Sequence, residues 1–170
     1  MPKEDSNQVL YKILIERLEQ LRTMDKEGDS DRRRHIARET NELHAPLAHR
    51  LGLYAIKTEM EDLALKFLDY KTYKYIAHAL NEKKAQRDAY IHSFIMPLEE
   101  KLKAAGFEFT IKGRPKSIHS IYHKMQVQRC DVDRIYDLFA IRIILDSPLE
   151  HEKSDCWQVY SIITDMYRPN

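Results

Sequence analysis

Residues 106–145, GFEFTIKGRPKSIHSIYHKMQVQRCDVDRIYDLFAIRIIL, decide the fold class of this chain. Residues 107–112 (FEFTIK) alternate apolar and polar side chains, which predicts a short, half-buried strand. Residues 138–145 (LFAIRIIL) are mostly apolar and rich in isoleucine, which predicts a central strand. Between them, residues 116–127 show helical spacing, and Asp131 is expected to cap a short helix. This stretch therefore indicates the beginning of an α+β domain.

The rest of the chain is expected to be mostly helical. Apolar residues at helical spacing predict helices over residues 8–24, 30–51, 54–68, 71–105 and 153–167. Ser30 is a candidate cap for the second of these helices, and Gly52 and Gly106 stand where the second and fourth end. Pro46 and Pro97 predict kinks inside those same two helices.

The composition excludes several classes of protein. Only 4 of the 170 residues are glycine, so few turns with positive φ can form and an all-β sandwich is not expected. The 28 basic and 27 acidic residues leave a net charge of +1, which provides no general attraction to nucleic acid or to a membrane. No apolar run is long enough to span a bilayer, and two cysteines are too few for a disulfide framework or a zinc site. We expect a cytoplasmic protein without a membrane partner.

One segment departs from this balance of charge. Residues 113–142 contain six basic and three acidic side chains, a local charge of +3. Within it, Lys116, Ser120 and Lys124 are spaced at i, i+4 and i+8, on one face of the predicted helix. Near a helix N-terminus this row predicts a cradle for polyphosphate, because backbone N–H groups and the helix dipole favour anions there. On spacing alone, a solvated helix face is the commoner explanation.

Three further residues of the segment are unusual for their positions. Gly113 allows a turn with a close approach of the backbone. Asp137, which enters an apolar strand, is costly to bury unless it is bound to a hard cation such as Mg²⁺ or paired, for instance with Arg134. Arg142 is out of place in a plain core strand, although an edge strand tolerates such a residue.

Longer motifs connect this segment with a known family. GRPKSIHSIYHKM (residues 113–125), followed by IYDLFAIRI (residues 135–143), resembles the start of the synthetase domain of the RelA/SpoT homologue family. These are the stringent-response enzymes that make guanosine tetra- and pentaphosphate. HAPLAHRLGLYAIKTEMEDLALKFL (residues 44–68) resembles the helical stretch that joins the family's hydrolase and synthetase domains. The resemblance covers roughly residues 8–170.

The resemblance implies a fold, a domain order and an activity. The fold is a predominantly helical α+β chain, in which an N-terminal helical region is followed by the start of a mixed-sheet, nucleotidyltransferase-like synthetase domain. Residues 1–29 are expected to be a remnant of a degenerate hydrolase-type domain, residues 30–105 a helical linker, and residues 106–170 the first part of the synthetase domain. The implied enzyme is a GTP pyrophosphokinase, which transfers pyrophosphate from ATP to the ribose 3′-hydroxyl of GTP or GDP.

The motif match also assigns roles to individual residues. Arg114 resembles one of two arginines that sandwich the adenine ring, and Arg142 is a candidate either for the second arginine or for a phosphate contact. The residues that match ATP-phosphate contacts are Lys116, Ser120 and Lys124. Asp137 matches the catalytic carboxylate that binds Mg²⁺. Because positions 137 and 142 differ by five, Asp137 is expected to precede the regular strand unless a bulge intervenes.

The chain departs from the family pattern at both ends. ILIERLEQLRTM (residues 13–24) takes the place of the hydrolase motif LADRLHNMRT, with Glu16 for the metal-binding Asp and Glu19-Gln20 for the His-Asn pair. The family's His-Asp dipeptide is absent from the sequence, so hydrolase activity is not expected. At the other end, the chain stops before the guanine-stacking Tyr loop and the second catalytic carboxylate. We therefore expect an ATP half-site alone, and a boundary at Asn170 that lies inside the domain.

Other conspicuous side chains are assigned simpler roles. His44 and His49 are expected to pack or cap rather than to bind metal, because they are five residues apart. For His119 and His123, phosphate contact or exposure is expected rather than zinc binding. Trp157 is expected to pack the last helix onto the sheet.

Two alternatives to the enzyme remain open. The helices of residues 8–105 suit a non-catalytic regulatory or interaction module. The basic face of residues 112–134 suits contact with RNA, such as ribosomal RNA or tRNA, in the full-length protein.

Overall fold

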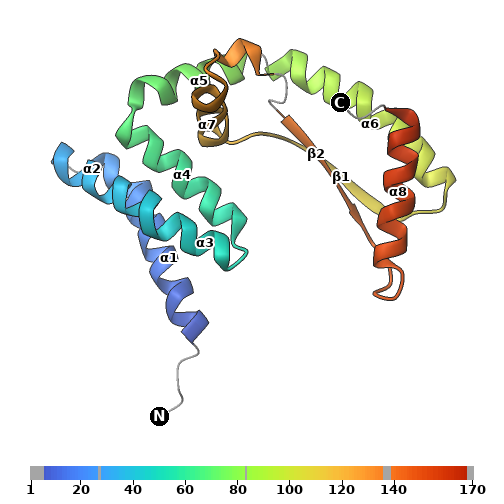
Figure 1. Cartoon of the computed structure of the whole chain (residues 1–170), viewed down its shortest axis with the longest axis horizontal. Coiled ribbons are helices and arrows are strands. Elements are labelled where there is room, and N and C mark those ends of the chain that lie inside the picture. Colours follow the sequence, from blue (N-terminus) through green and yellow to red (C-terminus); the bar gives the residue numbers. More distant parts are fainter. Residues whose placement is uncertain (1–5, 27, 83, 136–138, 168–170) are drawn as a thin grey trace. The chain divides into compact units, whose positions relative to one another are not determined.

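The structure, a computed structural model, describes residues 6–26, 28–82, 84–135 and 139–167 (Figure 1). Its elements are mostly helices together with a two-stranded antiparallel sheet, which confirms the predicted, predominantly helical α+β class. The chain divides into two compact units: unit 1 comprises Met1–Ala79 and Ser117–Tyr136, and unit 2 comprises Leu80–Lys116 and Asp137–Asn170. None of the described helices combines the length and the apolar character that a membrane span requires.

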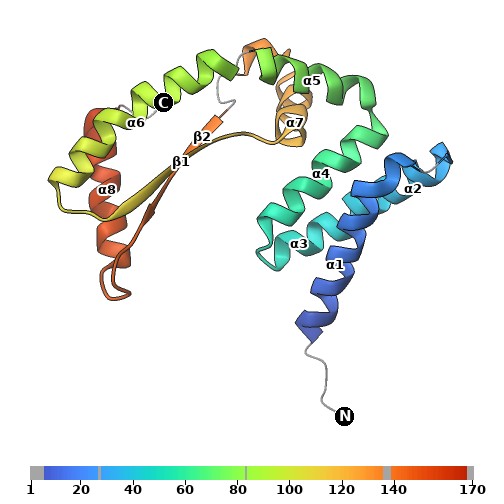
Figure 2. The ribbon, with the colours of Figure 1, turned by 180° about the vertical axis from the view of Figure 1, so that it is seen from behind.

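Unit 1 is built from helices. Its elements are α1 (Ser6–Thr23), η1 (Met24–Lys26), α2 (Ser30–Glu39), η2 (Thr40–His44), α3 (Ala45–Arg50), α4 (Tyr54–Leu68), most of α5 (Tyr70–Glu82), α7 (Ile118–Gln128) and η3 (Val132–Arg134). Helix α4 packs against α1, α2 and α3, and Figure 2 shows α1 and α3 beside it. The buried side chains of these helices form one core: Leu14, Leu18, Leu21, Met24, Ile36, Ala48 and Met60. The predicted helices over residues 8–24 and 54–68 are confirmed.

The helix predicted over residues 30–51 forms, with two differences of detail. Asp29 rather than Ser30 is its cap, because the Asp29 side chain accepts hydrogen bonds from two backbone N–H groups of the first turn. Ahead of Pro46, the backbone widens into the π-helical turn η2, since proline lacks the N–H that would donate to the preceding turn. Gly52 ends the helix in the left-handed conformation, with φ of 73°, as predicted.

Unit 2 combines helices with the sheet. Its elements are the end of α5, α6 (Lys84–Ala104), β1 (Phe109–Pro115), β2 (Phe139–Leu145) and α8 (Glu152–Met166). The single helix predicted over residues 71–105 is described as α5 and α6, and α6 continues through Pro97. Gly106, with φ of 84°, ends α6, and its N–H donates to the carbonyl of Lys103 at 3.0 Å.

The two predicted strands pair with each other. Strand β1 runs antiparallel to β2, from the pair Phe109–Leu145 to the pair Pro115–Phe139. Strand β1 begins two residues later than the sequence predicts. Strand β2 was expected to be central, but among the described residues it pairs with β1 alone, so one of its edges has no partner strand.

One face of this ladder packs against α6 and α8. Apolar side chains from both strands contact the buried side chains of Leu98, Leu102 and Val159. The prediction for Trp157 is wrong: this side chain is 64% exposed and makes an edge-to-face contact with Tyr160. Val159 takes the buried position instead, because two residues on a helix are separated by about 200°.

Gly113 makes a close approach, but not in the predicted turn. It lies within β1, without a positive φ, and pairs with Ile141. A Cβ atom placed on Gly113 would lie 2.8 Å from Cγ2 of Ile91 on α6. The absence of a side chain at position 113 therefore lets α6 and the strand pack against each other.

Replacing Gly113 by Ala is expected to lower the free energy of unfolding by about 1–3 kcal/mol, because Ile91 or the strand must shift to admit the methyl group. Urea unfolding followed by circular dichroism measures this loss. Gly28→Ala is the matched control, since a Cβ there meets nothing within 4 Å. Equal stability of the two variants would show that the packing of α6 on β1 does not require glycine.

Candidate functional site

Helix α7 carries two of the predicted site residues, Ser120 and Lys124. The helix begins after Ser117, whose Oγ accepts a hydrogen bond from the backbone N–H of Ser120 at 3.1 Å. Its apolar side is anchored by Ile121, which is fully buried, whereas Ser120 is exposed and Lys124 half-buried. It ends at Arg129, which adopts the left-handed conformation with φ of 50°. Ser120 and Lys124 thus lie one turn apart on an anchored helix.

A carboxylate from α4 holds the N-terminus of α7. Asp62 Oδ1 accepts a hydrogen bond from the backbone N–H of His119 at 2.8 Å, and its Oδ2 accepts one from the N–H of Ile118 at 3.4 Å. Burial raises the pKa of Asp62, and the two backbone N–H groups oppose the rise because they stabilise the charged form. A negative charge at this end of a helix also interacts favourably with the helix dipole. Asp62 therefore ties α7 to α4.

Side chains next to Asp62 extend this contact. Nδ1 of His119 lies 3.5 Å from Oε2 of Glu61, and Nζ of Lys57 lies 3.4 Å from Oε1 of the same carboxylate. His119 is half-buried beside Glu61 rather than exposed; the phosphate contact predicted as the alternative stays a prediction. His123 is exposed, as predicted.

The hydrogen bonds at this helix end correct one part of the predicted phosphate cradle. The sequence predicts that backbone N–H groups of the first turn help to bind polyphosphate. In the structure, the N–H groups of Ile118 and His119 donate to Asp62, and that of Ser120 donates to Ser117. These backbone N–H groups therefore already have acceptors within the protein. Ser120 Oγ already accepts a hydrogen bond from Ser117 Oγ at 2.7 Å.

Strands β1 and β2 bring other predicted residues together. Their register places Lys112 directly opposite Arg142 and places position 114 on the same side of the ladder, two residues along. The opposite side carries Ile111 and Ile143, which pack into the core of unit 2. Arg142 is therefore not a misplaced core residue, because it lies on the exposed side of the strand.

The exposed side of the ladder concentrates positive charge. Lys112 and Arg142 are both exposed, and neither forms an ion pair with any residue within the described ranges. Like charges directly opposite each other in a sheet repel, at a cost of about 0.2–1 kcal/mol. A bound anion would remove this cost, so the surface formed by these two side chains is a candidate phosphate-binding surface.

The remaining predicted residues are placed only in part. Asp137 lies outside the described residues, as does the side chain of Arg114; strand β2 begins at Phe139, two positions after Asp137. Packing assigns Arg114, Lys116 and Arg142 to unit 2, and Ser120 and Lys124 to unit 1. Positions 114 and 142 share one side of the ladder in unit 2, and Ser120 and Lys124 lie one turn apart on α7 in unit 1. Over the described part of the chain, no group of three or more His, Cys, Asp or Glu side chains is placed to hold a metal ion.

The segment that matches the hydrolase motif forms surface ion pairs. Glu19 lies 2.5 Å from Nη1 of Arg22, and Glu59 of α4 binds the same guanidinium through both carboxylate oxygens. Glu16 is exposed on the same helix. Glu19, which stands at the family's His position, is exposed and forms an ion pair with Arg22 of the same helix; the contact with α4 is made by Arg22 through Glu59.

His44 and His49 pack or cap, as predicted. Nδ1 of His44 lies 3.4 Å from the backbone carbonyl oxygen of Glu39. Burial lowers the pKa of His44, and the charge of Arg17 adds to this effect. The ring of His49 makes an edge-to-face contact with Tyr54 at a centroid distance of 5.4 Å.

Sequence reasoning missed two residues that shape the candidate site. Lys112 had a detectable signal, because it continues the polar half of the alternation in FEFTIK and so faces solvent beside Arg142. Asp62 had no such signal. It sits among other acidic residues of α4, and its contact with α7 joins positions 56 and 57 residues apart.

Comparison with known proteins agrees with the motifs. Residues 113–170 match the family described as the region found in RelA / SpoT proteins. Residues 4–54 match the family described as HD domain, so this second match reaches into α4. The HD match includes the segment in which Glu16, Glu19 and Gln20 depart from the hydrolase motif.

Curated relatives are similar over most of the chain. A probable guanosine-3′,5′-bis(diphosphate) 3′-pyrophosphohydrolase of Synechocystis sp. is 37% identical over 162 residues, which cover 95% of this chain and 20% of the relative. A GTP pyrophosphokinase of Escherichia coli (strain K12) is 36% identical over 155 residues, covering 91% and 20%. One of Streptomyces coelicolor is 37% identical over 161 residues, covering 95% and 18%. The chain thus spans about a fifth of the length of the relatives that it matches.

Replacing Asp62 by Ala removes the acceptor of two N–H groups of α7, and we expect the free energy of unfolding to fall by about 1–2 kcal/mol. The pKa of Asp62 is higher in the folded chain than in the unfolded chain, so the folded chain binds the proton more tightly. The stabilisation by Asp62 is therefore largest below about pH 4 and decreases as the pH rises towards about 7.

Urea unfolding at both pH values tests this expectation, with Asp165→Ala, an exposed carboxylate of α8, as the control. The loss in Asp62→Ala should be larger at the lower pH. A variant as stable as the unmodified chain would contradict the assigned role of Asp62, and a loss that grows with pH would contradict its raised pKa.

Proposed function

Because this chain belongs to the RelA/SpoT family, we propose that it is part of a cytoplasmic GTP pyrophosphokinase and carries the ATP side of the active site. The observation that carries this proposal is the exposed pair of like charges, Lys112 and Arg142, within and beside the segment that matches the family. The proposed reaction transfers pyrophosphate from ATP to the 3′-hydroxyl of GTP or GDP.

Each proposed contact follows from the chemistry of its side chain. Planar guanidinium groups stack on aromatic rings, so Arg114 is proposed to contact adenine, and Arg142 either the same ring or a phosphate. Lys116 and Lys124 are proposed to contact phosphate oxygens as point charges. The hydroxyl of Ser120 can donate to a phosphate oxygen, because it is exposed and needs only to rotate.

Asp137 is proposed as the ligand of Mg²⁺. This cation commonly takes one or two carboxylates together with substrate phosphates and water, rather than a cage of protein ligands. A single carboxylate in the same motif segment as the proposed phosphate contacts suits that pattern. The ion supplies neutralisation of phosphate charge when bound, and Asp137 positions it.

For unit 1 we propose a packing role rather than hydrolysis. The Synechocystis relative is named as a pyrophosphohydrolase, and the HD match covers residues 4–54, so hydrolysis is the natural competing function. Against it stand the replacements at Glu16 and Glu19 within the matching motif and the ion pair of the Glu19 side chain with Arg22. This role corresponds to a helical module that supports or regulates the synthetase part.

We expect calorimetry to show binding of ATP to the chain in the presence of Mg²⁺. Replacing Arg114, Lys124 or Arg142 by Ala should each weaken binding at least tenfold, because a hydrogen bond to a charged group contributes about 1.5–3 kcal/mol. Asp137→Ala should remove the dependence on Mg²⁺.

Lys101→Ala is the matched control, because Lys101 is an exposed cation of α6 outside the proposed site. It should bind ATP as the unmodified chain does. Unchanged binding in all three site variants would refute the proposed ATP site, and equal weakening in the control would show that only net charge matters.

The hydrolase proposal has its own test. Incubation of the chain with guanosine 3′,5′-bis(diphosphate) and a divalent metal ion should release no pyrophosphate above the buffer rate, because the metal-binding residues of the motif are replaced. Chromatography of the nucleotide products measures this. Release that a chelator abolishes would contradict the proposed packing role of unit 1.

A further inference from the structure

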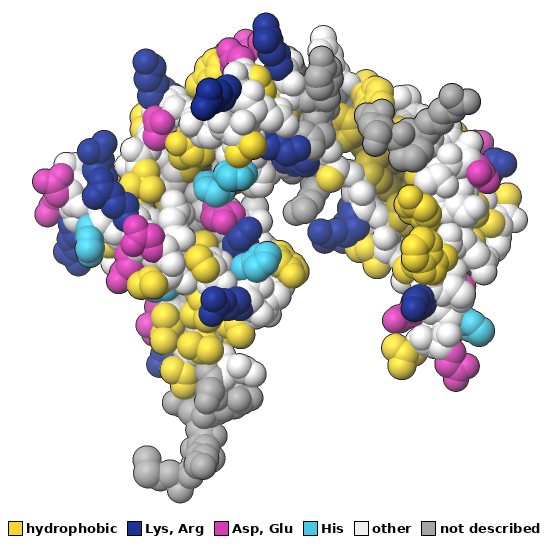
Figure 3. All heavy atoms as spheres, in the orientation of Figure 1, with side chains coloured by type: hydrophobic (Ala, Val, Ile, Leu, Met, Phe, Trp, Pro, Cys, Tyr) yellow, Lys and Arg dark blue, Asp and Glu magenta, His cyan; other side chains and the backbone are white. Residues whose placement is uncertain are grey.

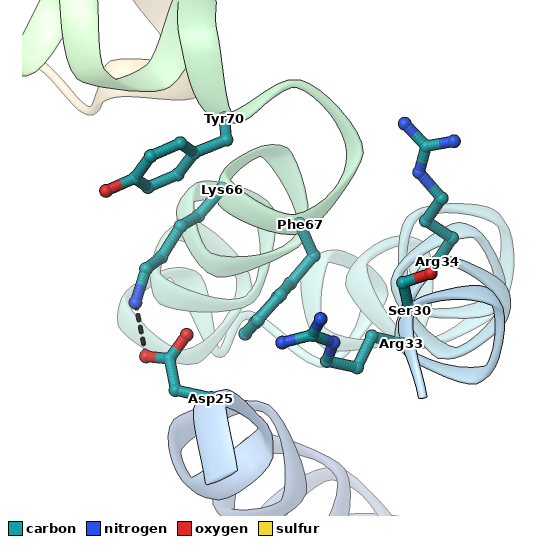
Figure 4. Close-up of a pocket in the computed structure, with 7 residues that line it drawn as sticks. All are labelled: Asp25, Ser30, Arg33, Arg34, Lys66, Phe67 and Tyr70. Atoms are coloured by element: carbon teal, nitrogen blue, oxygen red, sulfur yellow. Dashed lines mark hydrogen bonds and ion pairs between the residues drawn. The ribbon is translucent and has the colours of Figure 1, made fainter. Parts of the chain in front are cut away.

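Unit 1 contains a cavity that the proposed synthetase site does not use. It has a volume of about 460 Å³ and lies where the ends of three segments meet: η1, the first turn of α2, and the end of α4 with the start of α5. Small-molecule sites typically measure about 300–1,000 Å³. Figure 4 shows the side chains that line this cavity, all of them from unit 1.

The lining of the cavity is strongly cationic. Arg33, Arg34 and Lys66 line it, against one carboxylate, Asp25, which forms an ion pair with Lys66. Neither Arg33 nor Arg34 forms an ion pair with a residue in the described part of the chain. Figure 4 shows the guanidinium group of Arg33 beside the ring of Phe67, and that of Arg34 at the edge of the group. The guanidinium groups of Arg33 and Arg34 can therefore both donate hydrogen bonds to an anion in this cavity.

The surface around the cavity increases this positive potential. Helix α2 carries Arg32, Arg33, Arg34 and Arg38 within seven residues, and Figure 3 shows Lys and Arg side chains gathered over this helix. Two backbone N–H groups at the start of α2 do not contribute to binding an anion, because they donate hydrogen bonds to the side chain of Asp29. Any anion in the cavity would be held by side chains.

The cavity also offers two aromatic faces. Phe67 and Tyr70 line it, and Tyr70 is 56% exposed although its ring is large and mostly apolar. The Nζ atom of Lys66 lies 5.6 Å from the centroid of the Phe67 ring. Aromatic rings beside unpaired guanidinium groups are the combination that binds a planar base and its phosphates, because stacking and charge-assisted hydrogen bonds act together.

We propose that this cavity binds a nucleoside di- or triphosphate, with Arg33 and Arg34 on the phosphate oxygens and the base against Tyr70. The site is separate from the proposed ATP site, whose residues lie on β1, β2 and α7 and in the segments that join them. A ligand here would contact η1, α2, α4 and α5 at once and so would stabilise the packing of unit 1.

The test is a titration of the 170-residue chain, labelled with ¹⁵N, with ADP and in parallel with inorganic pyrophosphate. ADP should shift the amide signals of residues 25–34 and 66–70, and these signals report the cavity separately from residues 112–142. Arg33→Gln/Arg34→Gln should weaken binding of both probes at the cavity at least tenfold, and it should leave shifts in residues 112–142 unchanged. Tyr70→Leu should weaken the binding of ADP severalfold and leave the binding of pyrophosphate unchanged.

Arg38→Gln/Arg50→Gln is the matched control, because it removes the same charge from exposed positions that do not line the cavity. Wild-type affinity in this control supports a specific site. The proposal is overturned if ADP shifts no signal of residues 25–34 and 66–70, if the control weakens binding as much as the cavity variant, or if Tyr70→Leu affects both probes equally. Failure of the ATP site alone would appear as unchanged signals over residues 112–142.

Discussion

The hydrogen bonds from α7 to the Asp62 carboxylate are the constraint on which the candidate site depends. The chain leaves unit 1 after α5, forms α6 and β1, and returns to unit 1 as α7. The carboxylate of Asp62 accepts hydrogen bonds from the first N–H groups of α7. Ile121, on the same helix, is fully buried. The consequence is that Ser120 and Lys124 belong to the helical unit, whereas Lys112 and Arg142 belong to the sheet.

Two places on the molecule carry basic side chains that form no ion pair with any described residue. Some basic side chains are balanced locally; Arg22, for example, is held between Glu19 and Glu59. Other basic side chains form no ion pair within the described part of the chain: Lys112 and Arg142 on the exposed ladder, and Arg33 and Arg34 at the cavity of unit 1. Like charges that lie directly opposite each other in a sheet, as Lys112 and Arg142 do, lower stability. These cations are the physical link between the fold and the proposed functions.

Local patterns in the sequence predicted most of the fold, and long-range contacts account for what they missed. Helix and strand positions followed from apolar periodicity, and Gly52 and Gly106 were recognisable as helix ends. The orientation of Trp157 was wrong, because the buried face of α8 is selected by the sheet, and Val159 rather than Trp157 faces it. The site residues on the ladder could be placed by alternation.

The Asp62 contact and the cavity of unit 1 could not be predicted, since both join segments that are distant in sequence.

ATP binding by residues 113–142 is the proposal on which the function depends. The most direct measurement is photolabelling of the chain with a photoreactive ATP derivative and Mg²⁺, followed by mass spectrometry of the labelled peptides. We predict that label falls within residues 109–145 and that unlabelled ATP prevents it. Label confined to peptides outside that segment, including those that line the cavity, would contradict the claim.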